Sequence, residues 1–286
     1  PPAGSTDFVA REVGAKMGEY MGHQVIIDNR PGAGTLLGLQ LGATARPDGY
    51  TITFATSSGL AVNPALGVKM PFEPLRDFIP IGLLVYVPYF IVINPALPAR
   101  NIKELIDYAR TQPGKLNFAS PGVGTPNHLG IEMLNQMAGV KFVHVPYKGG
   151  AQAITDLVAG QVQLMFGTMP ATLPQAKSGK LRALGVSSLK RATAAPEVPT
   201  IAEGGVAGFE VLNWYGITLP GGTSQTIVRA LNQDLLKALA TPAMVEAFNA
   251  QGNEVAGGTP AEFAAFIKSE ITKYAKVVKA ANIRAE

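Results

Sequence analysis

Two stretches rich in glycine and hydroxyl residues lead directly into helical patterns. The first, PPAGSTDFVAR, opens the chain, and the second, ASPGVGTPNHLG, spans residues 119–130. In the second stretch Gly122 and Gly124 precede Thr125, a good N-cap, and Pro126, which suits the first helical position. Helix N-termini present free backbone amides, and glycine lets a ligand approach them closely. Together the two stretches favour binding of a small anion by backbone donors and hydroxyl groups.

Sequence signatures of catalysis are missing. The three histidines, His23, His128 and His144, show no paired spacing such as HExxH, and no GxSxG motif occurs. The 119–130 stretch resembles a dinucleotide fingerprint, but Asn127 stands where the third glycine belongs, and no GK[ST] follows a glycine loop. We therefore expect no catalytic residue, no metal and no cofactor.

The composition is that of a globular protein with a weakly charged surface. The 286 residues are 47% hydrophobic and 15% charged, against roughly 25% charged in an average protein. The net charge is +4, and no basic run predicts nucleic-acid binding. No cysteine is present. The most apolar run, 79–93, is shorter than the roughly 20 residues of a membrane span, and because Pro88 interrupts it we expect two buried strands there.

Helical and strand patterns alternate along the chain, which indicates an α/β fold with a mostly parallel sheet and helices on both faces. Further strands are expected at 23–29, 51–56, 116–120, 141–147, 162–167, 181–188 and 253–256. Helices are expected at the chain start and at about 35–45, after Asn101, and at 124–139, 150–160, 224–240, 242–251 and 260–281. Because an α/β chain rarely opens on a helix, we expect that a parallel strand before Pro1 is missing from this sequence.

Two segments, 93–101 and 209–219, are predicted to connect two domains. The first domain would contain residues 1–100 plus 213–286, and the second would contain residues 101–212. A chain of this length is also more than one core usually fills. The expected ligand site lies between these two domains, where the carboxyl ends of the strands face each other.

An ordered set of motifs resembles a known family. PPAGSTDFVAR, NRPGAG, PDGYT, SPGVGTPNHL, HVPYKGGAQAITDLVAGQVQLMF, EVPTIAEGG and NWYGITLPGGT occur in the order found in Bug-type extracytoplasmic solute receptors of tripartite tricarboxylate transporters. The resemblance implies a periplasmic-binding-protein-like fold (type II), with two α/β domains around a central cleft. It also implies a periplasmic, non-enzymatic receptor that captures a dicarboxylate or aromatic acid. The expected partners are this small organic carboxylate and membrane transporter subunits, and the receptor itself is expected to be a monomer.

The resemblance also implies which residues hold the ligand. Each domain contributes one loop to the ligand's carboxylate, partly through ordered waters, and a third loop enters the cleft. The implied residues are Ala3, Gly4, Ser5, Thr6 and Asp7 in the first loop; Ser120, Gly122, Val123, Gly124, Thr125 and Asn127 in the second; and Ser57 and Ser58 in the third. From their places at a strand end and on the returning connection, Tyr147 and Trp214 are further candidates. Asp7 is also a candidate cap or brace, and His128 a candidate support for the second loop.

Two other functions remain open at the level of sequence. An enzyme acting on a small carboxylate could use the same anion-binding loops, and turnover assays would separate it from a receptor. A ligand-sensing receptor for a membrane kinase would show the same ligand chemistry as a transport receptor.

Overall fold

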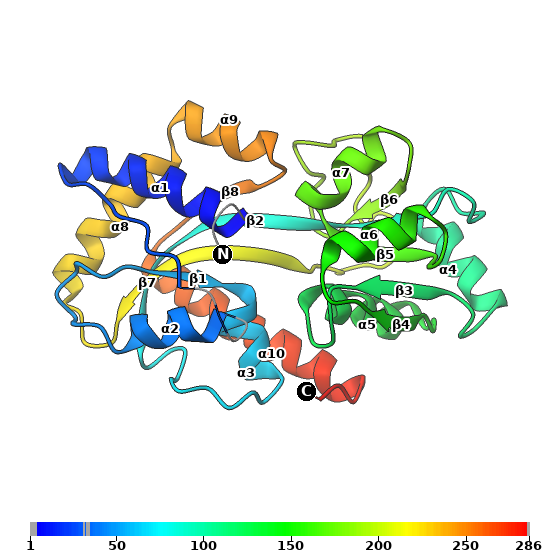
Figure 1. Cartoon of the computed structure of the whole chain (residues 1–286), viewed down its shortest axis with the longest axis horizontal. Coiled ribbons are helices and arrows are strands. Elements are labelled where there is room, and N and C mark those ends of the chain that lie inside the picture. The colour runs from blue at the N-terminus through cyan, green and yellow to red at the C-terminus, as the bar shows by residue number, and fades with distance from the viewer. Residues whose placement is uncertain (1–4, 31, 33–34, 285–286) are drawn as a thin grey trace. The chain divides into compact units, whose positions relative to one another are not determined.

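The structure, a computed structural model, describes residues 5–30, 32 and 35–284 (Figure 1). The chain forms two compact units. Unit 1 contains Pro1–Tyr86, Trp214–Ala250 and Glu254–Ala275, and unit 2 contains Val87–Asn213, Gln251–Asn253 and Lys276–Glu286. The functional domains expected from the sequence, 1–100 plus 213–286 and 101–212, stay a prediction.

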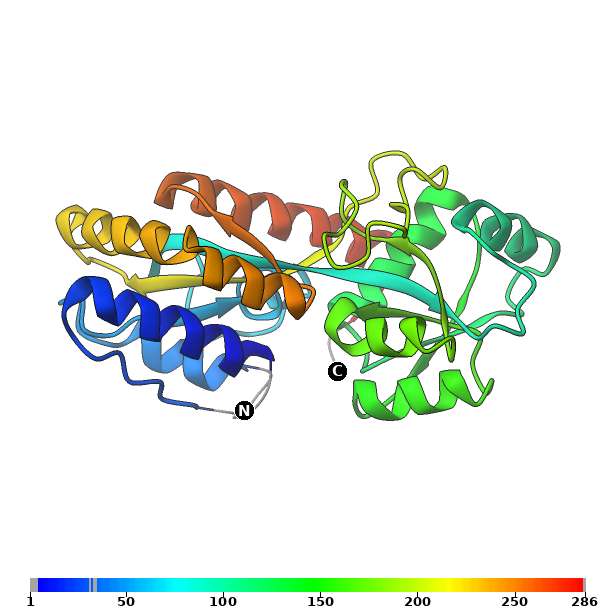
Figure 2. The same cartoon turned by 90° about the horizontal axis from the view of Figure 1, so that it is seen from above.

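Unit 1 is built on α1, whose buried residues recur at the helical period. Val9, Val13 and Met17 are buried on one face of this helix, which packs beside α8 (Figures 1 and 2). The elements that lie in or begin in this unit are α1 (Ser5–Met21), α2 (Leu36–Ala43), β1 (Thr53–Thr56), a π-helical turn (Ser58–Val62), α3 (Asn63–Ala65), β2 (Phe78–Ile93), α8 (Gln225–Leu239), α9 (Pro242–Ala250), β8 (Glu254–Gly257) and α10 (Pro260–Ala280). Strand β7 (Leu212–Pro220) enters unit 1 at Trp214.

Unit 2 alternates strands and helices as the sequence predicts. Its elements, besides the second half of β2, are α4 (Ile102–Thr111), β3 (Asn117–Ser120), α5 (Pro126–Ala138), β4 (Val143–Pro146), α6 (Gly150–Val158), β5 (Leu164–Thr168), α7 (Met169–Lys177) and β6 (Arg182–Val186). The predicted cap of α4 is confirmed, because Asn101 Oδ1 accepts a hydrogen bond from the Glu104 backbone N–H at 2.8 Å.

The expectation of a mostly parallel sheet is wrong. Strand β3 pairs in parallel with β4 and β5, but β2 pairs antiparallel with β5, β6 and β8, and β1 pairs antiparallel with β7. The parallel pairs belong to the β-helix-β part of unit 2, where each helix returns the chain to the same end of the sheet. Strands β2 and β7 connect the two units, and β2 is antiparallel to β5, β6 and β8 while β7 is antiparallel to β1.

One strand, β2, replaces the two strands expected around Pro88. It spans Phe78–Ile93 without a break. Its pairing with β8 ends at Tyr86, opposite Glu254, and its pairing with β5 begins at Tyr89, opposite Thr168. Pro88 therefore lies outside the ladders with β8 and β5, so its missing N–H removes no hydrogen bond of these two registers. Strand β2 also neighbours β7 in the sheet.

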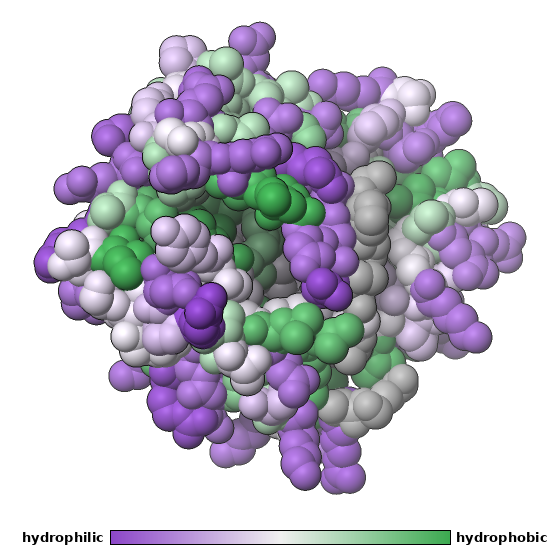
Figure 3. Space-filling model, turned by 60° about the vertical axis from the view of Figure 1, so that its left-hand side comes forward, coloured by the Kyte–Doolittle hydropathy of each residue, from purple (hydrophilic) through white to green (hydrophobic). Residues whose placement is uncertain are grey.

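The predicted strand at 23–29 is absent from the described structure. The segment alternates between exposed and half-buried residues, as a strand would, and Ile26 is 81% exposed. No described strand pairs with it, so its backbone lacks the ladder that defines a strand. Large apolar side chains also reach the surface elsewhere in unit 1, and Figure 3 shows one face on which small apolar patches interrupt polar surface.

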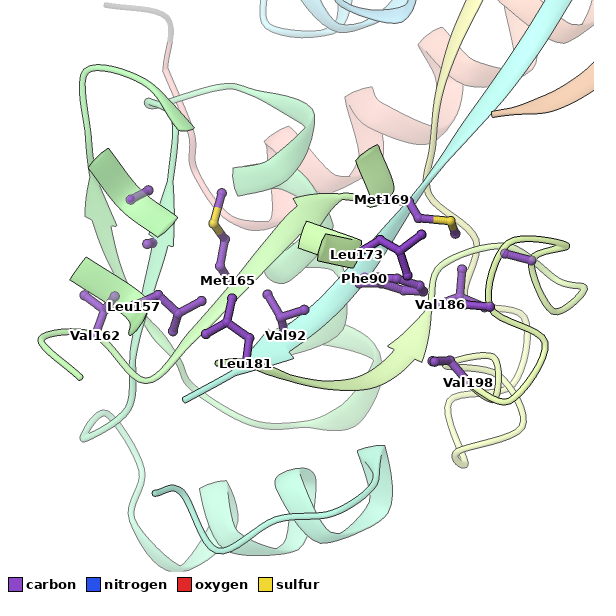
Figure 4. Packing of buried hydrophobic residues seen from close by; sticks show 14 residues of the cluster. Phe90, Val92, Leu157, Val162, Met165, Met169, Leu173, Leu181, Val186 and Val198 are labelled. Atoms are coloured by element: carbon purple, nitrogen blue, oxygen red, sulfur yellow. The ribbon is translucent and has the colours of Figure 1, made fainter. Parts of the chain in front are cut away.

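The core of unit 2 surrounds the second half of β2. Phe90 and Val92 of β2 pack with Met165 of β5 and with Leu173 of α7 (Figure 4). Helix α7 is absent from the sequence-based expectation, and the structure places both Pro170 and Pro174 within it. The structure tolerates Pro170 in the first turn, where no intrahelical N–H is needed, and contains Pro174 inside the helix.

Candidate functional site

The carboxyl ends of β3 and β4 lie side by side in unit 2. Ser120 is in register with Pro146, and the Tyr147 backbone N–H donates to the Ser120 carbonyl at 2.9 Å. The chain leaves β3 towards α5 and leaves β4 towards α6, so two helices begin at this edge. The first amides of a helix have no partner within it and carry a partial positive charge. This edge therefore brings together donors suited to an anion.

The loop between β3 and α5 is fixed by its own hydroxyl groups. Ser120 Oγ accepts the Gly122 N–H at 3.1 Å, and Thr125 Oγ1 donates to the Gly122 carbonyl at 2.8 Å. Thr125 also caps α5 as predicted, since its Oγ1 accepts the His128 N–H at 3.3 Å. Gly122 and Gly124 have backbone φ angles of 151° and 70°, which residues other than glycine rarely adopt. Glycine is thus required for the shape of this loop.

Two other predicted site residues of unit 2 use their side chains to join elements. Asn127 Nδ2 donates to the Phe166 carbonyl at 2.6 Å, which ties α5 to β5. The Tyr147 hydroxyl donates to Asp156 Oδ2 at 2.9 Å, and partial burial and this hydrogen bond together raise the pKa of Tyr147. Both residues lie beside the loop and brace it; their predicted ligand contacts, like that of Val123, stay predictions.

His128 and His144 also contact this loop. The predicted ligand contacts include neither, although the sequence analysis names His128 as a candidate support for the loop. The Gly124 N–H donates to His128 Nδ1 at 3.1 Å, and His144 Nε2 lies 2.6 Å from Ser120 Oγ. The TPNH sequence contains a usable signal for His128, because the third residue after an N-cap often bonds back to an amide before the helix. No such local signal exists for His144, which reaches the loop only through strand register.

In unit 1, Tyr215 joins two of the predicted loops. It lies opposite Thr56, the last residue of β1, and its hydroxyl is 3.5 Å from Ser5 Oγ at the start of α1. Ser57 and Ser58 follow Thr56 directly; Ser57 is fully buried and Ser58 is half-buried. Tyr215 thus contacts the start of α1 and pairs with the residue that precedes these two serines. The sequence-based set names Trp214 but not Tyr215.

Asp7 braces the first turn of α1. Its Oδ2 accepts a hydrogen bond from Arg11 Nε at 3.0 Å, and its Oδ1 accepts one from Asn29 Nδ2 at 2.8 Å. Asp7 is 7% exposed. Because Asn29 lies in the 23–30 segment, its bond to Asp7 joins this segment to the helix. Thr6 is half-buried beside it. The predicted contacts Ala3 and Gly4 lie outside the described residues.

Trp214 is fully buried at the point where β7 enters unit 1. Its Nε1 lies 3.3 Å from Glu270 Oε2, and its ring meets Phe263 and Phe266 edge to face. Glu270 also forms an ion pair with Lys273. The three partners of Trp214 and Lys273 all belong to α10. The predicted ligand contact of Trp214 stays a prediction.

Two further observations concern the part of the chain that the structure describes. Within residues 5–30, 32 and 35–284, no group of three or more histidine, aspartate or glutamate side chains is placed to hold a metal ion. None of the helices in these ranges combines the length and the apolar character needed to cross a membrane.

The two α/β units, built on a mixed sheet with loops rich in amides and hydroxyls, define the fold of a periplasmic solute-binding protein. The chain belongs to the tripartite tricarboxylate transporter family receptors (TctC), whose family model matches residues 9–283. This confirms the resemblance to Bug-type receptors. Proteins of this family are solute-binding receptors and not enzymes.

Known relatives match nearly the whole chain. Protein BugT of Bordetella pertussis is 37% identical over 280 residues, covering 98% of this chain and 86% of BugT. The structure of the periplasmic binding protein BugD is 36% identical, with a TM-score of 0.81, and covers 100% of this chain and 96% of that one. A structure from R. palustris with adipate is 33% identical, with a TM-score of 0.85, and covers 99% of this chain and 95% of that one.

Proposed function

We propose that this receptor is periplasmic, binds a small organic carboxylate, and delivers it to a tripartite tricarboxylate-type membrane transporter. The observation that carries the proposal is the edge of unit 2 at Ser120 and Tyr147, where two helices begin around a glycine-rich loop. The helix N-termini at this edge favour a negative charge, and the hydroxyl groups of Ser120 and Thr125 fix the loop that leads into α5. We further propose that the receptor works as a monomer.

The predicted first loop, at the start of α1, offers donors of the same kind in unit 1. Ser5 and Thr6 lie at the amino end of a 17-residue helix, and Tyr215 holds Ser5 near the serines that follow β1. We propose that this loop contributes to the same ligand, as the sequence predicts. Variants in each loop can be measured separately, so each contribution has its own test.

The chemistry proposed for the ligand is a dicarboxylate or aromatic acid. The R. palustris relative with adipate supports a dicarboxylate, because that protein is 33% identical over almost the whole chain. A hydrogen bond to a charged acceptor stabilises a complex by about 1.5–3 kcal/mol. Three or four such bonds approach the roughly 8 kcal/mol of micromolar binding, and apolar contacts with the rest of the ligand would supply the remainder.

Thermal unfolding with a panel of acids tests the proposal. The panel contains adipate, succinate and benzoate, with adipamide as the uncharged match to adipate. A ligand that binds the folded state at a hundredfold excess over its Kd adds about 2.7 kcal/mol, which raises Tm by several degrees in a chain of this size. Recovery of unchanged acid after incubation separates a receptor from an enzyme. If no acid in the panel raises Tm, the carboxylate proposal is wrong.

A further inference from the structure

Two histidines and a phenylalanine form a stack of rings directly behind the loop between β3 and α5. His128, in the first turn of α5, and His144, in β4, have ring centroids 3.8 Å apart and planes inclined by 11°. Phe118 of β3 stacks on His144, with centroids 4.8 Å apart. His128 is 6% exposed. Three elements thus meet in one stack, in which Phe118 and His128 are buried and His144 is half-buried.

Each imidazole holds a different part of the loop. The Gly124 N–H donates to His128 Nδ1 at 3.1 Å, which requires that this nitrogen carries no proton. His144 Nε2 lies 2.6 Å from Ser120 Oγ, which in turn bonds to the backbone of Gly122. The two imidazoles therefore fix both ends of the loop, and the bond at Gly124 requires that His128 is neutral.

Protonation affects the two histidines differently. A proton on His144 is compatible with its bond to Ser120, because a protonated Nε2 can donate to the hydroxyl oxygen. A proton on His128 Nδ1 removes the acceptor of the Gly124 amide and places two N–H groups against each other. A proton on one histidine also disfavours a proton on the other, because the two stacked rings are only 3.8 Å apart.

The groups that face His128 can be named. Glu132, on the next turn of α5, places Oε1 3.8 Å from His128 Nε2, too far for a hydrogen bond. Its carboxylate would favour a charged His128, but burial raises the pKa of Glu132 and so weakens that effect. Burial lowers the pKa of both histidines to about 4, and the charge of His144 contributes to the shift at His128.

We propose that His128 and His144 are positioning residues for the loop from Ser120 to Thr125. They hold the loop in its binding shape while both are neutral, and protonation of His128 releases the Gly124 amide and lowers ligand affinity. The part that concerns ligand affinity rests on the proposed function. The part that concerns the loop does not, and it has a test without ligand.

Amide hydrogen exchange at Gly124, measured by NMR near neutral pH without ligand, is the first test. In His128→Leu the amide loses its acceptor, and we expect exchange to be about tenfold faster or more. In His128→Asn the amide oxygen can take the place of Nδ1, so the rate should stay within about threefold of the parent. His23→Asn, at an exposed position in unit 1, is the matched control. Unchanged exchange in a folded His128→Leu variant overturns the proposal.

A pH titration keeps the proposal testable if His128→Leu does not fold. In the parent protein, the Gly124 amide signal should shift with the same midpoint as the His128 ring signal. In His128→Asn that transition of the Gly124 amide should vanish. A Gly124 signal that ignores the titration of His128 in the parent protein overturns the proposal as well.

Calorimetry with adipate as the probe is the last test. The carboxyl groups of adipate also titrate in acid, so the parent protein and His128→Asn are compared at equal pH. We expect affinities within about threefold near pH 7. The loss on acidification should be about twofold greater in the parent near pH 4, where half of the His128 side chains carry a proton, and about tenfold greater near pH 3. Equal losses overturn the proposal. If adipate binds neither protein near pH 7, adipate is not a ligand and the proposed function is weakened, while the exchange data still decide the role of His128.

Discussion

Asn127 donates its side-chain N–H to the carbonyl oxygen of Phe166 at 2.6 Å, and both groups are buried. The bond joins the first turn of α5 to β5, so it fixes the helix start that carries the candidate binding loop. The Asn127 side chain thus supports the loop from behind.

Replacing Asn127 should destabilise the protein. Asn127→Ala leaves the Phe166 carbonyl buried without this donor, which costs about 1–3 kcal/mol in the free energy of unfolding. Asn127→Asp should cost more, because it places a carboxylate against the carbonyl oxygen. Urea unfolding measures both effects, with Gln152→Ala on the exposed face of α6 as the control. An unchanged urea midpoint in Asn127→Ala contradicts this prediction.

The sequence predicts most elements of this fold because their patterns are local. The buried face of α1 follows the helical period, and the caps Asn101 and Thr125 stand at the starts of their helices. The failures depend on tertiary context. Pro88 interrupts a strand only if a ladder needs its N–H, and the register of β2 places Pro88 outside the ladders with β8 and β5.

The candidate site shows the same limit. The loop around Thr125 is visible in the sequence, because glycine, hydroxyl residues and an N-cap occur together. The contact between His128 and His144 is not, because the two residues meet only through the parallel register of β3 with β4. Tyr215 reaches Ser5, 210 positions away in the sequence, by the same kind of long-range pairing.

Thr125 should matter for both stability and binding. Thr125→Ala removes the N-cap of α5 and one hydroxyl of the loop, so we expect a loss of about 1–2 kcal/mol in the free energy of unfolding. Adipate or the acid found by thermal screening should bind about tenfold more weakly or worse. Urea unfolding and calorimetry provide the two measurements, and Thr125→Ser should restore most of both.

A second cap variant separates the two effects of Thr125. Ser224 caps α8 in unit 1 in the same way, accepting the Ile227 N–H at 3.5 Å. Ser224→Ala should reduce stability but leave ligand affinity unchanged. If Ser224→Ala and Thr125→Ala weaken binding equally, loss of stability explains the result and the loop is not in the site.

Stability should fall as the pH is lowered from about 6.5 to 4. Burial lowers the pKa of His128 and His144 from 6.5 to about 4 in the folded state. Between these pH values the unfolded chain binds more protons than the folded protein. The stability that the two neutral histidines contribute is therefore fully present above pH 6.5 and is lost as the pH falls towards 4. The loss is on the order of 3 kcal/mol for one such histidine. Urea unfolding at several pH values measures it.

Variants identify the histidines as the source of this pH dependence. His128→Asn should reduce the dependence between pH 6.5 and 4 by about half, because His144 still contributes, and His23→Asn should leave it unchanged. Asp77 is a partly buried carboxylate whose pKa is lowered to about 2 by hydrogen bonds from Arg76 and the Glu73 backbone, so its contribution to stability is lost only below about pH 4. An equally steep dependence in His128→Asn would show that other groups cause it.

Trp214 and Glu270 should be energetically coupled. Trp214→Phe removes the N–H that faces the buried carboxylate, and Glu270→Gln removes its charge and its ion pair with Lys273. Each change should cost about 1–3 kcal/mol. The double variant should lose less than the sum by at least about 0.5 kcal/mol. Urea unfolding should be monitored by circular dichroism. Tryptophan fluorescence cannot be used, because Trp214 is the one tryptophan in the sequence and Trp214→Phe removes it.

The same two variants test the predicted ligand contact of Trp214. Glu270→Gln should leave ligand affinity within about threefold of the parent, because it changes only the packing partner. If Trp214 contacts the ligand, Trp214→Phe should lower affinity by much more than threefold. Equal affinities in the two variants would assign Trp214 to the packing of β7 against α10 alone.

The candidate site should recognise the negative charge of a carboxylate by means of backbone donors. The sequence from 3 to 7 and from 120 to 127 contains no lysine or arginine. At the amino ends of α1 and α5, the amides favour an anion, and their hydrogen bonds weaken when the acceptor is neutral. Dimethyl adipate should therefore not bind measurably, although it matches adipate in chain length. Calorimetry with adipate, its monomethyl ester and its dimethyl ester measures this dependence on charge.

The monoester shows whether one carboxylate or both are recognised. If the loops hold a single carboxylate, the monoester should bind within about tenfold of adipate, because its free carboxylate can occupy the same donors. Raising the ionic strength should weaken binding only modestly, because the donors are fixed dipoles close to the ligand and not exposed side-chain charges. Binding of the dimethyl ester as tight as that of adipate would contradict recognition by charge, and the loop around Gly124 would then lie outside the site.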